Sequence, residues 1–421
     1  MNTSAEVTEK RDHARRVARN PALLCVHHAL MMSLFPMAIL TLFQRDHLGM
    51  NLAEVMGVQA AFAASLALFE FPSGYLADRI GYRRTLLGAA VLSIIAWAVY
   101  TASTGLWSVV LAEVLLGLGL SLVSGTNSAM LYESLVDVGQ EREFARWFGR
   151  SRFFSQISEG SAALVAGLLF ALDVRLPFAL MVVVWVVNLG VTLALVEPRF
   201  ERRAADDPFE HVRSLVHFVA HRAPRLRALF FVAVVLSLAS FVPVWLFALY
   251  ASDAGVPVSW LGPLWAISNY CVALGSIGSN RVGRATGLVR ALVICTALIA
   301  IGYAGMGLTT AWWGFVFYFA FCFSRGIFSP LIAHAEQQEI PSGDRAGLTS
   351  LRSLLFRAGF IVLGPATGAL IDRHGQHAVL LGLGGLLVSL GLVGAAWLAA
   401  QPAVESETPI IARDGAPERR S

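Results

Sequence analysis

Long apolar runs separated by short polar stretches dominate the chain. A helix needs ~20 mostly apolar residues to cross ~30 Å of hydrocarbon, and twelve runs of suitable length occur. They lie at 22–43, 53–77, 85–104, 107–131, 153–172, 176–196, 227–250, 258–279, 287–307, 311–333, 349–371 and 378–399. We therefore expect an all-α membrane protein with twelve transmembrane helices.

The composition agrees with a membrane location. Of the 421 residues, 56% are hydrophobic and only 14% are charged, whereas a soluble domain carries roughly 25% charged residues. Cys25, Cys271, Cys295 and Cys322 all lie inside apolar runs, without a CxxC pair or a ligand spacing to histidine. We interpret them as small buried side chains and expect neither a disulfide nor a metal site.

The basic residues alternate along the chain from one connection to the next. Alternate connections and the two tails hold twenty-eight of the 32 Lys and Arg residues, if Arg227, Arg290, Arg352 and Arg357, which fall inside predicted runs, are counted with the adjoining connection. The opposite connections hold only Arg45, Arg175 and Arg373. Because Lys and Arg stay on the cytoplasmic side of a membrane, both termini are predicted to be cytoplasmic.

The longest connection divides the predicted spans six and six. Within it, apolar residues recur at helical spacing between His and Arg residues, which predicts an amphipathic helix on the cytoplasmic membrane surface; an unstructured linker is the alternative. These residues are Phe209, Val212, Leu215, Val216 and Val219. The expected division is a cytoplasmic tail 1–21, a six-helix half 22–196, a cytoplasmic linker 197–226, a second half 227–399 and a disordered tail 400–421.

The two predicted halves echo each other at an offset of about 202–203 residues. "SNRVGR" (279–284) falls where "ADRIGY" (77–82) falls in the first half. "LYESLVDVGQER" (131–142) corresponds to "HAEQQEIPSGDR" (334–345), which pairs Glu133 with Glu336 and Arg142 with Arg345. Duplicated halves of this kind are typical of secondary transporters, whose substrate site lies near the midplane between them.

The stretch "GYLADRIGYRR" (74–84) resembles the signature between the second and third spans of the major facilitator superfamily. Two further stretches, "EFPSGYLADRIG" and "SGTNSAMLYESL", look like a bacterial branch with Glu-x-Pro-Ser/Thr-Gly and Ser-Gly-Thr-x-x-Ala-x-Leu-Tyr patterns. The resemblance implies two pseudo-symmetric six-helix halves. It also implies a central cavity lined by spans one, four, seven and ten.

The charged stretch 74–84, between the second and third spans, is predicted to form a cytoplasmic gate. Asp78 would accept hydrogen bonds from the N-terminus of the helix that starts near Thr349, and the arginines would pair with Glu133 or lipid phosphates. The predicted gate residues are Gly74, Asp78, Arg79, Gly81, Arg83, Arg84, Glu133 and Arg142, with a second-half echo at Asn280, Arg281, Gly283, Arg284, Glu336 and Arg345. Plain positive-inside anchoring is the alternative; it explains the arginines but not Asp78 or the glycines.

Charged and polar residues inside the predicted spans are candidates for substrate binding or ion coupling, because a charge at a helix centre costs about 2.5–3.5 kcal/mol. They are Arg325, Glu113, His27, His28, Asn127 and Asn269. Glu113 and Arg325 could attract each other, and a purely structural buried pair is the rival interpretation. One histidine is expected to face the cavity and the other a neighbour or lipid. For Glu70 we favour a structural role.

Catalytic and nucleotide-binding motifs are missing from the sequence. It has no GxxxxGK[ST] loop and no HExxH, so we expect no cofactor, no catalytic metal, no enzyme activity and no nucleic-acid partner. The prediction is a monomeric, proton-coupled secondary transporter of a small organic solute in a bacterial inner membrane. Aromatic residues in spans seven and ten favour export of an amphipathic compound. Arg325 favours the alternative, import of a polar or anionic metabolite, and a non-transporting scaffold or receptor is the alternative from another class.

Overall fold

The computed structural model describes residues 11–199, 208–221, 223–339 and 345–402, and every regular element within these ranges is a helix. At 71, 74, 75, 78, 145, 208–212, 214, 345 and 346 only the backbone belongs to the described part. The predicted gate residues Gly74, Asp78 and Arg345 fall at such positions. Their side chains therefore lie outside the described residues.

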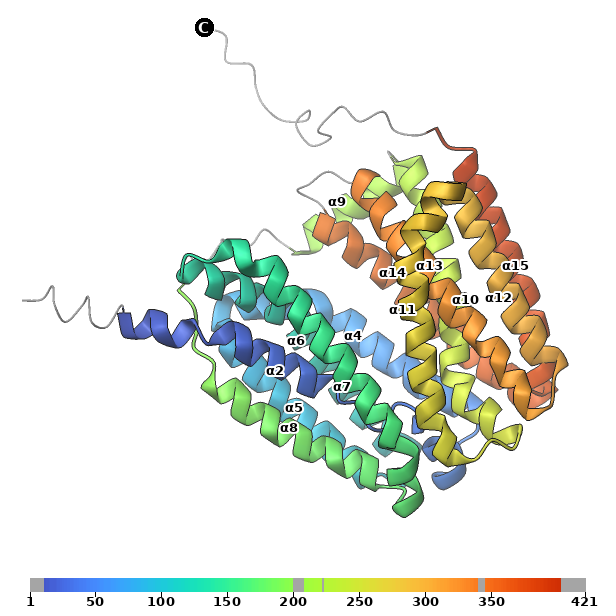
Figure 1. Cartoon of the computed structure of the whole chain (residues 1–421), viewed down its shortest axis with the longest axis horizontal. Helices are drawn as coiled ribbons and strands as arrows, with labels where there is room; N and C mark the ends of the chain where they lie inside the picture. Colours follow the sequence, from blue (N-terminus) through green and yellow to red (C-terminus); the bar gives the residue numbers. More distant parts are fainter. Residues whose placement is uncertain (1–10, 200–207, 222, 340–344, 403–421) are drawn as a thin grey trace, which may run out of the picture.

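The helices gather in two groups that lie side by side (Figure 1). The first group holds α2 (Asn20–Met31), α3 (Leu40–Leu42), η1 (Phe43–His47), α4 (Leu52–Ile80), α5 (Tyr82–Thr101), α6 (Leu106–Asp137), η2 (Glu141–Glu143), α7 (Phe144–Leu172) and α8 (Leu176–Ala194). The second group holds α10 (Pro224–Asp253), η3 (Val258–Trp260), α11 (Leu261–Thr286), α12 (Leu288–Leu308), η4 (Trp312–Phe317), α13 (Tyr318–Glu339), α14 (Arg345–His374) and α15 (Gln376–Ala399). Helix α9 (Pro208–His221) lies between them in the chain.

All twelve predicted apolar runs fall on helices, and 10 helices of the described part are long and apolar enough to cross a membrane. The run 22–43 is broken between α2 and α3 by turns around Pro36. The run 258–279 forms α11, in which polar residues such as Asn269 interrupt the apolar sequence. The count of twelve spans and the cytoplasmic placement of the termini stay predictions.

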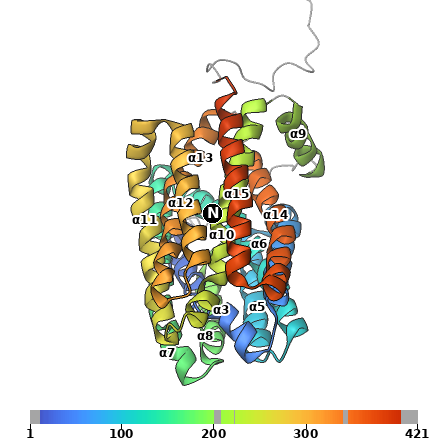
Figure 2. The ribbon, with the colours of Figure 1, turned by 90° about the vertical axis from the view of Figure 1, so that its right-hand side faces the viewer.

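The helices pack on one another within each group and also across the boundary between the groups. Helices α4 and α6 pack on each other in the first group, and α11 and α13 in the second. Across the boundary, α4 packs against α14 and α7 against α11. Figure 2, turned by 90° about the vertical axis, shows the second group from its outer side, with α9 beside it.

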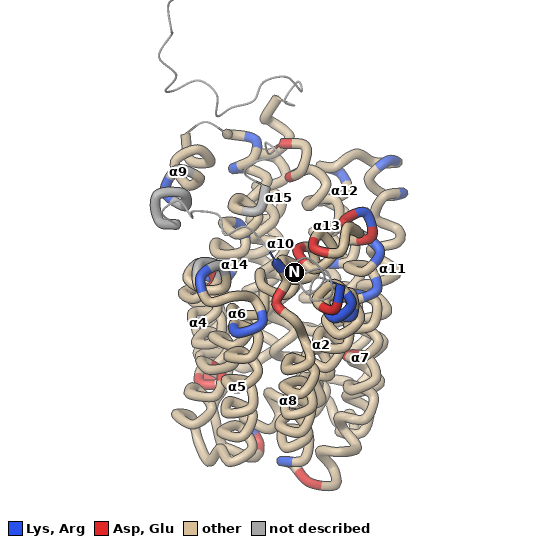
Figure 3. The backbone as a smooth tube through the Cα atoms, turned by 90° about the vertical axis from the view of Figure 1, so that its left-hand side faces the viewer, with Lys and Arg blue, Asp and Glu red and all other residues tan. Residues whose placement is uncertain are grey.

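The two ends of the bundle differ in charge. Figure 3 shows most Lys and Arg residues at the end that carries α9, and few at the opposite end. We call the first the basic end; it includes Arg83 at the start of α5 and Arg142 after α6. The opposite, far end includes Arg45 of η1 and Asp372 of α14. This separation of charge agrees with the alternation of arginines along the chain.

The predicted linker helix is present as α9 and turns a narrow apolar stripe toward the protein. Leu215 and Val219, four residues apart, are buried, whereas Val216 and His217 are exposed. Helix α9 contacts α10 and α14. Phe209 and Val212 lie outside the described side chains. The location of α9 on a membrane surface stays a prediction.

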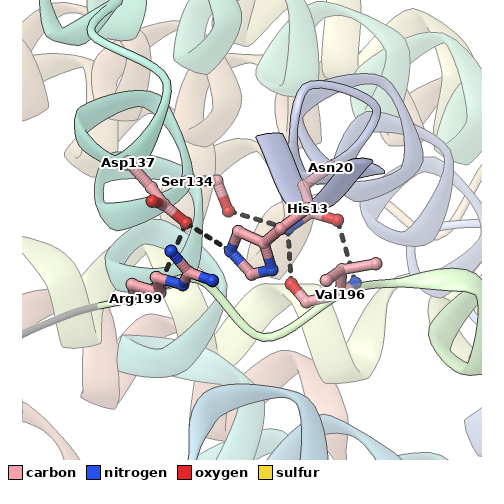
Figure 4. A network of polar contacts seen from close by, with 6 residues as sticks. All are labelled: His13, Asn20, Ser134, Asp137, Val196 and Arg199. Carbon is pink, nitrogen blue, oxygen red and sulfur yellow. Dashed lines mark hydrogen bonds and ion pairs between the residues drawn. The ribbon is translucent and has the colours of Figure 1, made fainter. Parts of the chain in front are cut away.

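A buried asparagine joins three segments at the basic end of the first group (Figure 4). The Nδ2 of Asn20 donates to Ser134 Oγ (2.9 Å) and to the Val196 carbonyl (2.7 Å), and its Oδ1 accepts from the Val196 backbone N–H (3.0 Å). Next to it, Asp137 Oδ2 accepts from the backbone N–H of Arg199 (3.0 Å) and lies 2.9 Å from His13 Nε2. The start of α2 is thereby fixed to the end of α6 and to the chain after α8.

Candidate functional site

A cavity of about 330 Å³ lies among α2, α4, α6 and α7, toward the basic end. Helix α14 of the second group contributes Arg357 to its wall, so the cavity sits at the boundary between the groups. Its polar lining residues are His28, Ser124, Asn127, Ser128, Ser151, Arg152 and Arg357. Its apolar ones include Leu24, Met31, Met32, Leu66, Leu120 and Phe148.

Two of the predicted candidates meet in this cavity. His28 is 8% exposed and its Nδ1 lies 2.8 Å from Ser151 Oγ of α7. Asn127 of α6 presents a buried Oδ1 that has no hydrogen-bond partner among the described residues. Since a buried polar atom without a partner is costly, this oxygen is suited to accept a hydrogen bond from a bound solute.

An ion pair crosses the boundary beside the cavity. Arg357 of α14 donates through Nη1 to Glu70 Oε2 of α4, and both side chains are mostly buried. Arg152 of α7 adds a second guanidinium to the cavity wall. The wall therefore holds two guanidinium groups, of which the one of Arg357 is paired with Glu70. An anionic group in the cavity would balance the positive charge of Arg152.

His27 and Glu113 lie away from the cavity, inside the first group. His27 is fully buried against Trp185 of α8, with ring centroids 6.4 Å apart. Glu113 is 4% exposed and accepts from the Tyr100 hydroxyl (3.3 Å), which in turn accepts from Gln44 Nε2 (2.6 Å). Their surroundings are therefore those of side chains buried inside the bundle.

Arg325 and Asn269 belong to the second group and do not line the cavity. Arg325 of α13 acts electrostatically on Glu159 of α7, across the boundary, and Trp265 lies beside that carboxylate. Asn269 donates to the Trp265 carbonyl one turn earlier in α11 (3.2 Å). Glu113 and Arg325, whose attraction the sequence suggested, each have a different partner.

The turn between α4 and α5 is closed by a carboxylate from the end of the first group. Gly81 has φ +99°, a left-handed conformation that suits glycine. This turn exposes the N-terminus of α5, where Glu197 accepts from the backbone N–H groups of Tyr82 (2.7 Å) and Arg83 (2.8 Å). Arg83 also donates to the Leu193 carbonyl (2.8 Å). In this conformation these hydrogen bonds join the start of α5 to the end of α8 and the chain that follows it.

The remaining predicted gate residues lie at the basic end. Glu336 of α13 forms an ion pair with Arg352 of α14 (2.7 Å), within the second group. Glu133 and Gly283 are half-buried, and the other described gate residues are exposed. These exposed residues are Arg79, Arg84, Arg142, Asn280, Arg281 and Arg284.

At the far end the two groups are in close contact. Arg45 Nη1 of the first group donates to Asp253 Oδ1 of α10 (2.8 Å). Helix α11 approaches α7 at Gly262, where a Cβ atom would overlap the carbonyl oxygen of Ala163. These contacts close the far end between the groups, whereas the cavity lies toward the basic end.

The model of the Major Facilitator Superfamily matches residues 22–362, most of the chain. The chain belongs to the major facilitator superfamily. Its structure is also similar to that of the nucleoside transporter NupG (TM-score 0.76, 15% identity, covering 92% of this chain and 100% of that one). A second similar structure is that of the POT family transporter PepTSo (TM-score 0.71, 14% identity, covering 91% of this chain and 97% of that one). At such low identity these structures show the fold alone.

One curated relative is the uncharacterized MFS-type transporter YxaM of Bacillus subtilis (strain 168), 26% identical over 166 residues. The match covers 37% of this chain and 38% of that protein, so the chain spans well under half the length of this relative. The superfamily membership and the apolar helices together make the chain a multi-pass membrane protein of a secondary-transporter family.

The cavity contains residues that the sequence did not mark as candidates. Arg357 lies inside the predicted span 349–371, yet it was counted with the tenth connection, and Arg152 was counted with the fourth. A charge inside a predicted span is the signal that could have identified Arg357. Ser151 carried no such signal, because it lies before the predicted span 153–172, in a connection where a serine is ordinary.

Proposed function

We propose that this chain is an alternating-access transporter of a small organic solute that carries an anionic or strongly polar group. The solute would bind in the cavity of His28, Asn127, Arg152 and Arg357. The observation that carries this proposal is the combination of two guanidinium groups with an unpartnered amide oxygen in one cavity. Arginine is well suited to carboxylate and phosphate groups, because its planar fork can donate two hydrogen bonds to them.

The basic end is proposed to face the cytoplasm, in a bacterial inner membrane. The excess of Lys and Arg at this end supports that orientation. With the far end closed and the cavity lying toward the basic end, the conformation would then be inward-facing. The predicted cytoplasmic gate around Asp78 would close in the opposite state, when the halves have rocked about the cavity.

The proposal is tested by a ligand-induced thermal-shift screen on purified protein, followed by transport in proteoliposomes. The panel contains small carboxylates, phosphates, nucleosides, peptides and neutral amphiphiles. A compound that stabilises the wild type is then measured with Arg152→Gln, which removes one cavity charge but leaves the Glu70–Arg357 pair intact. Arg146→Gln is the matched control, because Arg146 lies on the same helix, is exposed and pairs with Glu143 (2.8 Å).

We expect Arg152→Gln to weaken binding of an anionic compound at least tenfold, the loss of a charge-assisted hydrogen bond, and Arg146→Gln to leave it unchanged. Equal effects of the two substitutions would remove the cavity from the proposal. A panel without any stabilising or transported compound would favour the alternative that the fold serves as a scaffold or receptor.

Export of an amphipathic compound is the second candidate. The apolar part of the cavity wall, which includes Met31, Met32 and Phe148, favours it. Neutral amphiphiles that bind equally well to the wild type and to Arg152→Gln would support this candidate over the anionic solute. Direction is read from inverted and right-side-out vesicles that contain the same protein.

Proton coupling is proposed on the electrostatic interaction of Glu159 with Arg325 across the boundary. A carboxylate within electrostatic reach of an arginine of the opposite group changes its attraction to that arginine when it gains or loses a proton. Transport driven by an imposed pH gradient, and abolished by a protonophore, would support coupling.

A monomeric state is proposed because the cavity is formed within one chain; light scattering in detergent tests it.

A further inference from the structure

The far end contains a contact between α14 and α4 that joins the two groups through a charge and a helix terminus. Asp372, in the last turn of α14, accepts from the backbone N–H of Leu52 through Oδ1 (3.0 Å). Its Oδ2 accepts from the backbone N–H of Ala53 (2.9 Å). These are the first N–H groups of α4, which have no partner within their own helix.

A carboxylate is suited to this position for two physical reasons. The N-terminus of a helix carries a partial positive charge, so an anion there is stabilised. Hydrogen bonds to an ionised acceptor are also about twice as strong as neutral ones. Because Asp372 is exposed to solvent, it can exchange these bonds for water when the two helices separate. The contact is strong enough to favour one state and accessible enough to break.

The sequence around Asp372 repeats the motif at the end of α4. "GALIDRHG" (368–375) and "GYLADRIG" (74–81) share Gly, Leu, Asp, Arg and Gly at the same five positions. The copy at 368–375 lies at the end of α14, at the far end of the bundle, and the copy at 74–81 lies at the end of α4, at the basic end. In each copy the last glycine has a positive φ, +79° at Gly375 and +99° at Gly81.

The packing of α4 on α14 places the two copies at opposite ends of one helix pair. Helix α4 runs from the far end to the basic end, and α14 runs in the opposite direction. The end of each helix therefore lies toward the start of the other. At the far end this juxtaposition brings Asp372 to the start of α4, and Gly368 lies against the backbone of Leu52.

Resting on the proposed alternating-access function, we propose that Asp372 is a positioning residue that latches the far end closed by capping α4. When the far end opens, these two hydrogen bonds break, and Asp78 of the other copy would cap the start of α14 at the basic end. The helix pair α4 and α14 thus carries one latch for each state. The far-end latch is engaged in this structure.

The test measures the state of the far end without any substrate. Spin labels are attached at Thr104 and Thr310, two exposed loop threonines at the far end of the first and second groups. The four native cysteines are replaced by alanine or serine. Distance distributions between the two labels then give the ratio of open to closed far ends in lipid nanodiscs, for the wild type and for Asp372→Asn. Asparagine keeps the shape of aspartate but removes its charge.

Asp173→Asn is the matched control. Asp173 is also an exposed far-end aspartate that accepts from a backbone N–H, that of Arg175 (2.7 Å), but this bond lies within the first group. We expect Asp372→Asn to raise the open-to-closed ratio about two- to fivefold, the effect of an anion at a helix N-terminus. Asp173→Asn should leave the ratio unchanged. Asp372→Glu, which keeps the charge, should give an open-to-closed ratio between those of the wild type and Asp372→Asn.

Unchanged distances in Asp372→Asn, in a variant that melts like the wild type, would overturn the latch. A general loss of packing would instead change both Asn variants alike, which also contradicts the proposal. The result is independent of the solute: a shifted ratio without any transported compound would support the latch and count against the proposed transport function. Transport of a compound together with an unshifted ratio in Asp372→Asn would support the transport function and contradict the latch.

Discussion

The two groups approach each other closely at Gly262, and its substitution should open the far end. In Gly262→Ala the new Cβ would overlap the Ala163 carbonyl oxygen and lie 3.0 Å from that of Leu164. Both atoms belong to the backbone of α7, so no side-chain rotation relieves the overlap. Helices α7 and α11 must move apart, at a cost of about 1–3 kcal/mol typical of overpacking.

This cost falls only on the state in which α7 and α11 touch. The ratio of open to closed far ends should therefore rise by the corresponding factor, about 5-fold for 1 kcal/mol and more than 100-fold for 3 kcal/mol. Gly278→Ala is the control on the same helix, because nothing lies within 4 Å of the Cβ it would add. Since alanine favours helix over glycine by about 1 kcal/mol, the control should be stable and unshifted.

Spin labels at Thr104 and Thr310 give this ratio directly. In Gly262→Ala, we expect a second, longer distance or a clear increase in its population, with the Gly278→Ala variant like the wild type. A wild-type distance distribution in a folded Gly262→Ala variant would refute the reasoning. It would mean that the closeness of α7 and α11 does not limit the closed state.

Two further predictions concern the stability of the first group. Asn20→Ala removes three buried hydrogen bonds and leaves the Val196 backbone groups without them; we expect a loss of about 2–4 kcal/mol, seen as a lower melting temperature in detergent, and an unchanged temperature would contradict the role of this network. Glu197→Gln removes the charge that caps α5 and should cost about 1 kcal/mol. Exposed Glu141→Gln is its control in the same melting assay, and equal effects would show that the cap is not stabilising.

Hydropathy was sufficient to predict the helices. A long apolar run has to form a helix in a membrane, because its backbone groups have no other partners there, and each predicted run contains helix, with a break in the run 22–43. The role of Gly81 at the end of the gate motif could also be predicted, because the short connection before Tyr82 requires a tight turn. The break of the first run around Pro36 was not predicted.

Contacts between distant segments decided the site, and hydropathy does not encode them. Nothing in the sequence distinguishes His28, which lines the cavity, from His27, which faces Trp185; only the rotation of α2 does. The partner of Glu70 is 287 residues away. The copy of the gate motif around Asp372 is visible in the sequence, but it does not lie at the offset of about 202–203 residues that relates the two predicted halves.

The central claim is that the two groups must separate at the far end during each transport cycle. Arg45 and Asp253, which face each other across this end at 2.8 Å, are replaced by cysteine in a background without the native cysteines and joined by a short bifunctional thiol reagent. Uptake of the compound selected by the thermal-shift panel is then measured in proteoliposomes. The account predicts that uptake stops in the linked protein and continues in each single-cysteine variant treated alike. Full uptake by the linked protein would contradict it.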